Sequence, residues 1–456
     1  MTSSGRHGGG ASREVESTPL YQRLPHGPHG LERGEVIANQ RARIHGAMVE
    51  AVAANGYEAT SVRELVALAG VSRRSFYEQF ANKQECFLVT YALLAGGWVR
   101  RMTTAYRASE GDLEERMSVA FGALADGVSN YRKATRLVVV DAQTAGAEGL
   151  ARVRRTMLSA EHMLSSSFAR APQASPLPRP VSRGMAGGLH AAMSSHLREG
   201  CPEEVPQVAQ QMLRWTLEFQ SSKAEPMAAR LAERARAGVR AGQAEPAGPA
   251  GLGAKAPPRA DRERLLHGAL WLAAVEDYCD LTVPQITAAT AVSIEAFFEL
   301  FEGRDECYLA ALEMVAEELM EVVAEAIALA GDWPRGVRDG IGALMRFLAE
   351  RPLYARTVAA TAFTAGPRAL ERNLELARTI ALTLTAGAPP DSRSGLAVEA
   401  VTGAVWYTVH CQVAAERIQL LPLLADHLTY VVLAPFVGAE AAAETVSEPQ
   451  RLPAPQ

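Results

Sequence analysis

Residues 56–87 read GYEATSVRELVALAGVSRRSFYEQFANKQECF. Ser61, with an acidic residue three positions later, predicts the start of a helix, and Gly70 predicts its end. Ser72 predicts the start of the next helix, and Asn82 predicts that of a longer one. Two helices joined by so short a turn have the spacing of a helix-turn-helix, whose second helix enters the major groove of DNA.

The short helix expected after the turn has two faces. Phe76 and Phe80 are four residues apart and would pack inward. Arg73, Arg74 and Tyr77 lie on the other side. An arginine fork matches O6 and N7 of guanine, and a tyrosine hydroxyl can donate to a phosphate. An isolated Arg-Arg pair would be an ordinary solvated pair, but the helix and turn around this one favour DNA contact.

This stretch resembles the N-terminal domain of the TetR-type transcriptional regulators, over roughly residues 36–92. The likeness rests on Gly-Tyr before the second helix, AGVS at the turn, the pattern FYxxFxxK, and an acidic residue before an aromatic-rich helix. The resemblance implies that Tyr77 and Lys83 contact phosphates. The DNA-binding residues expected from the pattern and the resemblance together are Thr60, Ser61, Arg63, Ser72, Arg73, Arg74, Ser75, Tyr77 and Lys83.

The composition of the whole chain limits the classes of function. A length of 456 residues predicts two to four domains, and 48% apolar with 6% aromatic residues favours packed helices. A net charge of −5 requires any DNA-binding surface to be local. The five cysteines are scattered, so neither a disulfide framework nor a metal site is expected. No catalytic motif and no cofactor motif is found, so an enzyme is not expected.

The second half of the chain repeats the first. Residues 278–309 align with 57–88 without a gap and share 11 of 32 positions. The likeness returns farther along, where TAGAEGLAR at 144–152 is echoed by TAGPRALER at 364–372. A repeat of about 220 residues indicates duplication and fusion.

The second copy keeps the apolar residues of the helix-turn-helix and loses the polar ones. Ile294, Glu295 and Phe298 stand where the first copy has two arginines and a tyrosine. The net charge falls from +1 over residues 61–85 to −4 over residues 282–306. Because phosphate neutralisation dominates DNA affinity, we expect the second copy to fold without contacting DNA.

The expected fold is all-α, with two tandem TetR-like units, each a three-helix helix-turn-helix domain followed by a larger helical ligand-binding and dimerisation domain. The divisions expected along the chain are a disordered arm (1–34), a DNA-binding domain (35–92), a helical domain (93–225), a linker (226–260), a degenerate helix-turn-helix domain (261–312), a second helical domain (313–440) and a disordered tail (441–456).

Two arrangements of the halves remain open. The second half could take the place of a partner subunit and make an intrachain pseudodimer. Alternatively, the first halves could pair into a homodimer, with the second halves outside. Small residues at 184, 186–188, 395, 403 and 404 are the candidates for the close helix contacts of either arrangement.

The resemblance also implies a small-molecule effector. Candidate pocket residues in the first half are Met157, His162, Met163, Phe168, Trp215 and Phe219, and those in the second half are Phe363, Trp406, Tyr407 and His410. Ordinary core packing is the alternative for each of them.

The function expected is that of a cytoplasmic, ligand-responsive repressor that binds a double-stranded DNA operator through the first helix-turn-helix only. The alternative is a helical sensor or interaction module that has lost DNA binding. No apolar run reaches the roughly 18 residues of a membrane span, so no membrane partner is expected.

Overall fold

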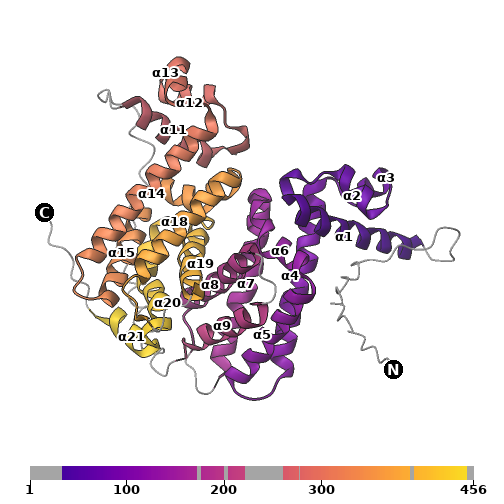
Figure 1. Cartoon of the computed structure of the whole chain (residues 1–456), viewed down its shortest axis with the longest axis horizontal. Helices are drawn as coiled ribbons and strands as arrows, with labels where there is room; N and C mark the ends of the chain where they lie inside the picture. Colours follow the sequence, from indigo (N-terminus) through magenta and orange to yellow (C-terminus); the bar gives the residue numbers. More distant parts are fainter. Residues whose placement is uncertain are drawn as a thin grey trace, which may run out of the picture. The chain divides into compact units, whose positions relative to one another are not determined.

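The computed structural model describes residues 33–171, 176–199, 204–220, 260–276, 278–390 and 395–448. Over these ranges the chain forms helices and no strand, which confirms the all-α prediction (Figure 1). The chain divides into an N-terminal unit, Met1–Thr90, and a C-terminal unit, Tyr91–Gln456. The expected arm (up to residue 32) and most of the expected linker lie outside the described residues.

The N-terminal unit is built on the turn that the sequence predicts. Its helices are α1 (Arg33–Ala59), α2 (Val62–Ala69), α3 (Arg73–Tyr77) and the first part of α4 (Lys83–Ala108). Gly70 ends α2 with a φ of 60°, a left-handed conformation that glycine adopts without a steric penalty. Leu65, Phe76 and Phe80 are buried, so the two helices of the motif pack on one apolar core.

The C-terminal unit begins with the helices of the first half and continues with those of the second. The first-half elements are the rest of α4, α5 (Leu113–Asn130), α6 (Arg132–Val139), η1 (Asp141–Thr144), α7 (Gly146–Arg170), α8 (Arg179–Glu199) and α9 (Val205–Leu217). The second-half elements are α11 (Ala260–Val275), η3 (Tyr278–Asp280), α12 (Val283–Thr290), α13 (Ile294–Leu300), α14 (Arg304–Ala328), α15 (Trp333–Glu350), α16 (Pro352–Arg356), η4 (Thr357–Thr361), α17 (Ala362–Thr364), α18 (Pro367–Thr385), α19 (Gly395–Val413), η6 (Ile418–Leu424), α20 (Ala425–Val437) and α21 (Ala439–Ser447).

The tail expected from residue 441 is wrong in its first part. α21 is a helix, and it buries Ala442, Ala443 and Val446 against the C-terminal unit. Its alanine-rich sequence has high helix propensity, which the sequence-based division overlooked.

The start of the second half has the same order of helices as the N-terminal unit. Ser293 caps α13 by accepting a hydrogen bond from the N–H of Ala296 at 3.1 Å. Phe297 and Phe301 are buried. The turn between α12 and α13 is closed by Ala291 with a φ of 53°, a strained conformation for a residue with a side chain. The second copy thus keeps the turn without the glycine.

Within the C-terminal unit, α8 and α19 approach so closely that their contact requires glycine. A Cβ atom added to Gly403 would lie 2.2 Å from the carbonyl oxygen of Gly187 and 2.4 Å from Cβ of Ala191. A Cβ atom added to Gly187 would lie 2.5 Å from the carbonyl oxygen of Gly403 and 2.6 Å from Cβ of Tyr407. The predicted role of these two glycines in a close helix contact is confirmed, and the contact lies between the halves of one chain.

One helical stretch among the described residues, Ile418–Val437, is long and apolar enough to cross a membrane, although no apolar run of that length is expected from the sequence. It contains Pro422 and Pro435, and most of it is buried among helices of the same unit. Burial of this kind is typical of a core helix, so the stretch by itself gives no sign of a membrane.

Gly403→Ala is expected to lower the free energy of unfolding of the C-terminal unit by about 1–3 kcal/mol, because the added methyl group would collide with the backbone of α8. Gly122→Ala is the matched control, since Gly122 lies within α5 with no atom near its missing Cβ. That change is expected to raise the stability by about 0.5–1 kcal/mol. Urea unfolding followed by circular dichroism measures both, and equal effects would contradict the close approach.

Candidate DNA-binding surface and candidate ligand cavity

The face of α3 opposite its buried side carries the residues expected to read DNA. Ser72 caps the helix by accepting a hydrogen bond from the N–H of Ser75 at 3.0 Å. Phe76 anchors the helix and is fully buried. Arg73 and Tyr77 are therefore exposed, and Tyr77 retains 48% of its accessible surface.

The cationic groups on this face could exchange their present partners for groups of DNA. The guanidinium of Arg74 is 88% exposed and pairs with Glu78 at 2.9 Å. An ion pair so exposed contributes little stability, so a phosphate or a base could replace the carboxylate at small cost. The guanidinium of Arg73 lies 6.0 Å from the ring centroid of Tyr77, so the two side chains share one side of the helix.

The predicted residues before α2 divide into exposed and buried ones. Ser61 and Arg63 are exposed at the start of the helix, where free N–H groups favour anions. Thr60 is only 2% exposed, and its hydroxyl donates to the carbonyl oxygen of Gly56 at 2.8 Å. The expectation that the Thr60 side chain contacts the DNA backbone is therefore wrong, because that side chain closes the end of α1.

Lys83 has a structural role that the sequence did not reveal. Its ammonium donates to the carbonyl oxygens of Tyr57 at 3.0 Å and Glu58 at 3.2 Å, and it lies 4.3 Å from the ring centroid of Tyr57. These contacts join the start of α4 to the end of α1. Lysine has three donors, so one is left for a phosphate.

The second copy repeats this contact with arginine. Arg304 donates to the carbonyl oxygens of Tyr278 at 3.3 Å and Leu281 at 2.9 Å, and its guanidinium lies 4.7 Å from the ring centroid of Tyr278. This contact accounts for the one cation that residues 282–306 contain. The guanidinium stabilises the packing of this segment, and its charge is not needed for a DNA-binding surface.

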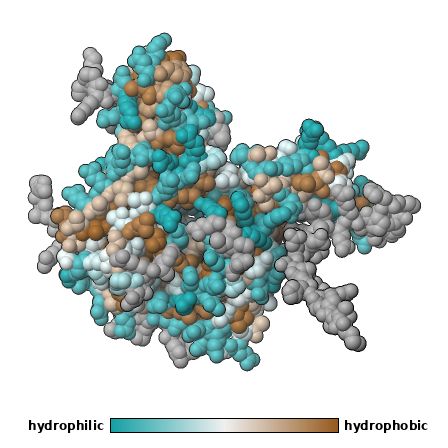
Figure 2. All heavy atoms as spheres, viewed as in Figure 1, coloured by the Kyte–Doolittle hydropathy of each residue, from teal (hydrophilic) through white to brown (hydrophobic). Residues whose placement is uncertain are grey.

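The exposed face of α13 has different chemistry from that of α3. Ile294 and Phe298 retain 46% and 54% of their accessible surface, and Glu295 and Glu299 are exposed beside them. Figure 2 shows apolar residues among hydrophilic ones on the lobe where Figure 1 labels α13. Such a face offers phosphates no donor side chain and adds repulsion.

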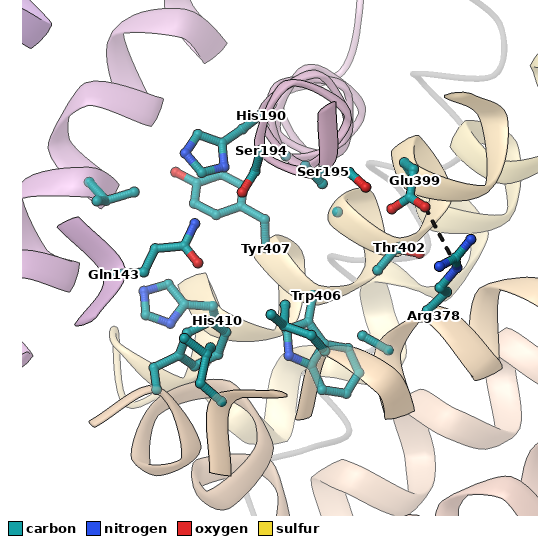
Figure 3. Close-up of a pocket in the computed structure, with 18 of the residues that line it drawn as sticks. Gln143, His190, Ser194, Ser195, Arg378, Glu399, Thr402, Trp406, Tyr407 and His410 are labelled. Carbon is teal, nitrogen blue, oxygen red and sulfur yellow. Dashed lines mark ion pairs between the residues drawn. The ribbon is translucent and has the colours of Figure 1, made fainter. Parts of the chain in front are cut away.

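The described part of the C-terminal unit contains a cavity of about 620 Å³ between the first and second halves (Figure 3). Its walls come from η1, α7 and α8 on one side and from α17, α18 and α19 on the other. A volume of this size suits a drug-sized molecule. Five of the ten candidate pocket residues line it, namely Met157, Phe363, Trp406, Tyr407 and His410.

The other five candidates, all from the first half, lie outside the cavity lining. His162 is exposed on α7 and does not line the cavity. Phe168 is fully buried, and Trp215 packs edge to face on Phe219 at 5.0 Å between ring centroids. These positions correct the expectation of a separate pocket in each half, because the long-range packing of α8 on α19 brings both sets of walls together.

Two partly buried histidines give the cavity uncharged hydrogen-bonding groups. Burial, assisted by the charge of Arg198, lowers the pKa of His190 to about 4. Burial also lowers the pKa of His410, whose Nδ1 donates to the carbonyl oxygen of Ala359 at 2.6 Å. Both imidazoles are therefore neutral near pH 7.

A π-helical turn, η4, supplies the carbonyl groups that fix the second-half wall. In addition to the contact of His410, Trp406 donates from Nε1 to the carbonyl oxygen of Val358 at 3.0 Å. A π-turn frees such carbonyl groups from the regular helical pattern. The indole and imidazole rings are thereby held in place at the edge of the cavity.

The sequence reasoning missed the polar residues of the first-half wall. Among them are Gln143, Arg154, His190, Ser194 and Arg198. The last three recur at every fourth position along α8, after its glycines. This periodicity was the one signal in the sequence that could have indicated them.

Lys83→Met is expected to destabilise the N-terminal unit by about 1–2 kcal/mol, because two carbonyl groups at the end of α1 lose their donor. Lys83→Arg is expected to preserve the stability, since Arg304 makes the same contacts in the second copy. Hydrogen exchange of the α2 amides in the full chain measures the effect. Equal losses in both variants would contradict the structural role of this cation.

Comparison with known proteins connects the N-terminal unit to a family. Residues 46–90 match the family described as "Bacterial regulatory proteins, tetR family". No curated protein matches the chain. Three solved transcriptional regulators are similar: FadR from Bacillus subtilis in complex with stearoyl-CoA (16% identity, 38% of this chain and 96% of that chain, TM-score 0.35), the fatty acid degradation regulator FadR from Bacillus halodurans (16%, 38% and 96%, 0.33), and a regulator from Rhodococcus sp. Rha1 (22%, 40% and 97%, 0.33).

TM-scores this low do not support a functional assignment. The family assignment therefore rests on the match over residues 46–90, which include α2 and α3. Residues 46–90 of the chain thus form a helix-turn-helix domain of the tetR family of bacterial regulatory proteins.

Proposed function

We propose that this regulator reads an operator with α3 of its first copy only and that a small molecule controls its DNA affinity, most simply as a repressor in the cytoplasm. The observation that carries the proposal is the contrast between two similar folds. α3 exposes Arg73, Arg74 and Tyr77, whereas α13 exposes Ile294, Glu295 and Phe298 at the same positions.

The electrostatics of the two copies support this assignment. Residues 61–85 carry a net charge of +1, and the matching residues 282–306 carry −4. Each phosphate contact made by a cation releases counterions and adds affinity, whereas carboxylates in the same place oppose binding. Selective loss of the polar face explains why the second copy keeps its core.

The contact between α8 and α19 supports an intrachain pseudodimer. Gly187 meets the Cβ of Tyr407, and Gly403 meets the Cβ of Ala191. Tyr407 stands four positions after Gly403, and Ala191 stands four positions after Gly187. Reciprocal contacts of this kind are the mark of a two-fold interface. The second half thus takes the place of a partner subunit, and each chain presents one reading head.

The cavity offers a route for control by a ligand. It is lined by both halves, so a bound molecule would favour one packing of α7 and α8 on α18 and α19. α4 runs from the DNA-binding domain into the C-terminal unit as one helix, which gives a continuous element for such coupling.

Arg73→Ala and Arg74→Ala are each expected to weaken operator binding about tenfold or more, since a bidentate arginine–guanine contact contributes about 1–3 kcal/mol. The matched controls are Ile294→Ala and Glu295→Ala, which alter the same positions of the second copy and should leave affinity unchanged. The operator is first selected from random duplex DNA with the full chain, and affinities follow from fluorescence anisotropy at fixed salt.

Unaltered binding by both arginine variants would contradict the assignment of α3. Absence of any selected sequence would favour a helical sensor or interaction protein that no longer binds DNA, for which the exposed apolar and acidic face of α13 is the supporting feature.

A further inference from the structure

The cavity walls consist of equivalent positions from the two halves. The reciprocal contacts of Gly187 and Gly403 fix the correspondence between α8 and α19. His190 stands three positions after the first glycine, and Trp406 stands three positions after the second. Both residues line the cavity. In a symmetric homodimer both positions would hold the same residue type. We therefore attribute the difference between histidine and tryptophan to divergence after fusion of the two halves.

At four matched positions the first-half wall is polar, whereas the second-half wall is mostly apolar. The first-half residues Gln143, Arg154, His190 and Ser194 correspond to the second-half residues Phe363, Leu374, Trp406 and His410. A symmetric interface could not place donor side chains on one wall opposite an aromatic and aliphatic patch on the other. Two halves of different sequence in one chain can provide such unlike walls. An unsymmetrical molecule would therefore bind in this cavity in one preferred orientation.

The polar wall contains hydrogen-bonding groups that the described residues do not satisfy. His190, Ser194 and Arg198 recur every fourth residue along α8 and share one face of the helix. The Ser194 hydroxyl oxygen is buried without a hydrogen-bond partner, a state that ordinarily costs stability. Arg198 donates to the side-chain oxygen of Gln143 at 3.4 Å and is otherwise exposed, with the charges of Asp141 and Glu399 acting on it.

Two of the three carboxylates that line the cavity are paired with second-half arginines, and the third, Glu371, lies on the second-half wall. Glu399 pairs with Arg378 at 3.7 Å, and Glu375 pairs with Arg372 at 2.9 Å. Figure 3 shows the Glu399–Arg378 pair on one side of the cavity, with Gln143, His190, Ser194 and Tyr407 gathered on the other. Arg154 adds a second guanidinium to the lining and donates to the carbonyl oxygen of Ala414 at 3.3 Å.

The opposite wall provides a surface for an apolar body. Trp406 is held by its hydrogen bond to the carbonyl oxygen of Val358, so its ring presents a fixed face. Phe363, Leu370 and Leu374 extend the apolar lining. Aromatic side chains of this kind bury large areas of a ligand with little loss of side-chain freedom.

We propose that this cavity binds one amphipathic organic acid per chain, with the apolar body against Phe363 and Trp406 and the anionic group against the α8 stripe of His190, Ser194 and Arg198. The inference deepens the ligand control proposed above by naming a ligand class and a stoichiometry. Binding itself does not depend on whether the chain reads DNA.

Two fluorescent probes of matched shape test the proposal on the full chain. 8-Anilinonaphthalene-1-sulfonate carries an anionic group, and N-phenyl-1-naphthylamine is the same ring system without it. The sulfonate probe is expected to bind once per chain and about tenfold more tightly, as a charge-assisted hydrogen bond to arginine allows. Arg198→Met should remove that preference and leave binding of the uncharged probe within about twofold.

A cavity-filling variant establishes where the probes bind. Thr402 lines the cavity, and Thr402→Trp should abolish binding of both probes. Leu382→Trp is the matched control, because Leu382 is exposed on α18 and lies outside the cavity lining. Retained binding in Thr402→Trp, two probe molecules per chain, or equal affinity for the two probes would overturn the proposal. Operator affinity measured in parallel separates this failure from a failure of DNA reading.

Discussion

The approach of Gly187 to Gly403 is the contact on which the C-terminal unit depends. No side chain separates the two helices at this point, and the added atoms of even an alanine would meet backbone oxygen. Because α8 and α19 are held at that distance, α7 and α18 come to face one another across a cavity. One backbone contact thus determines both how the halves pair and where a ligand could bind.

The two helix-turn-helix copies show which residues a fold can lose. The buried residues Phe297 and Phe301 and the cation at Arg304 remain, because the three helices cannot pack without them. Exposed positions carry no such requirement, and these are the positions at which arginine and tyrosine have been replaced. The fold therefore constrains the core and the domain-closing contacts and leaves the exposed positions free to differ.

The local features of the fold could be predicted from the sequence, whereas the long-range ones could not. Ser61, Gly70 and Ser72 act through hydrogen bonds to residues a few positions away, so they mark the ends of helices without reference to the rest of the chain. The side chain of Thr60 looked available for DNA for the same local reason. Its burial depends on how α1 ends in three dimensions, which the pattern does not express.

The cavity shows the same limit on a larger scale. Met157 and Trp406 were both expected near a ligand, but in separate pockets, because nothing in either local pattern says that residues so distant in sequence line one space. The glycines of α8 and α19 did indicate a close contact. What remained hidden was the geometry of that contact, and with it the role of His190 and Ser194 as cavity groups rather than core residues.

The central claim is that only the first copy reads DNA. Hydrogen–deuterium exchange of the full chain, with and without its selected operator, tests it most directly because both copies are observed in one molecule. The account predicts slowed exchange in α2 and α3, with the amides of α12 and α13 unchanged. Slowed exchange in α12 and α13 to the same degree would contradict it.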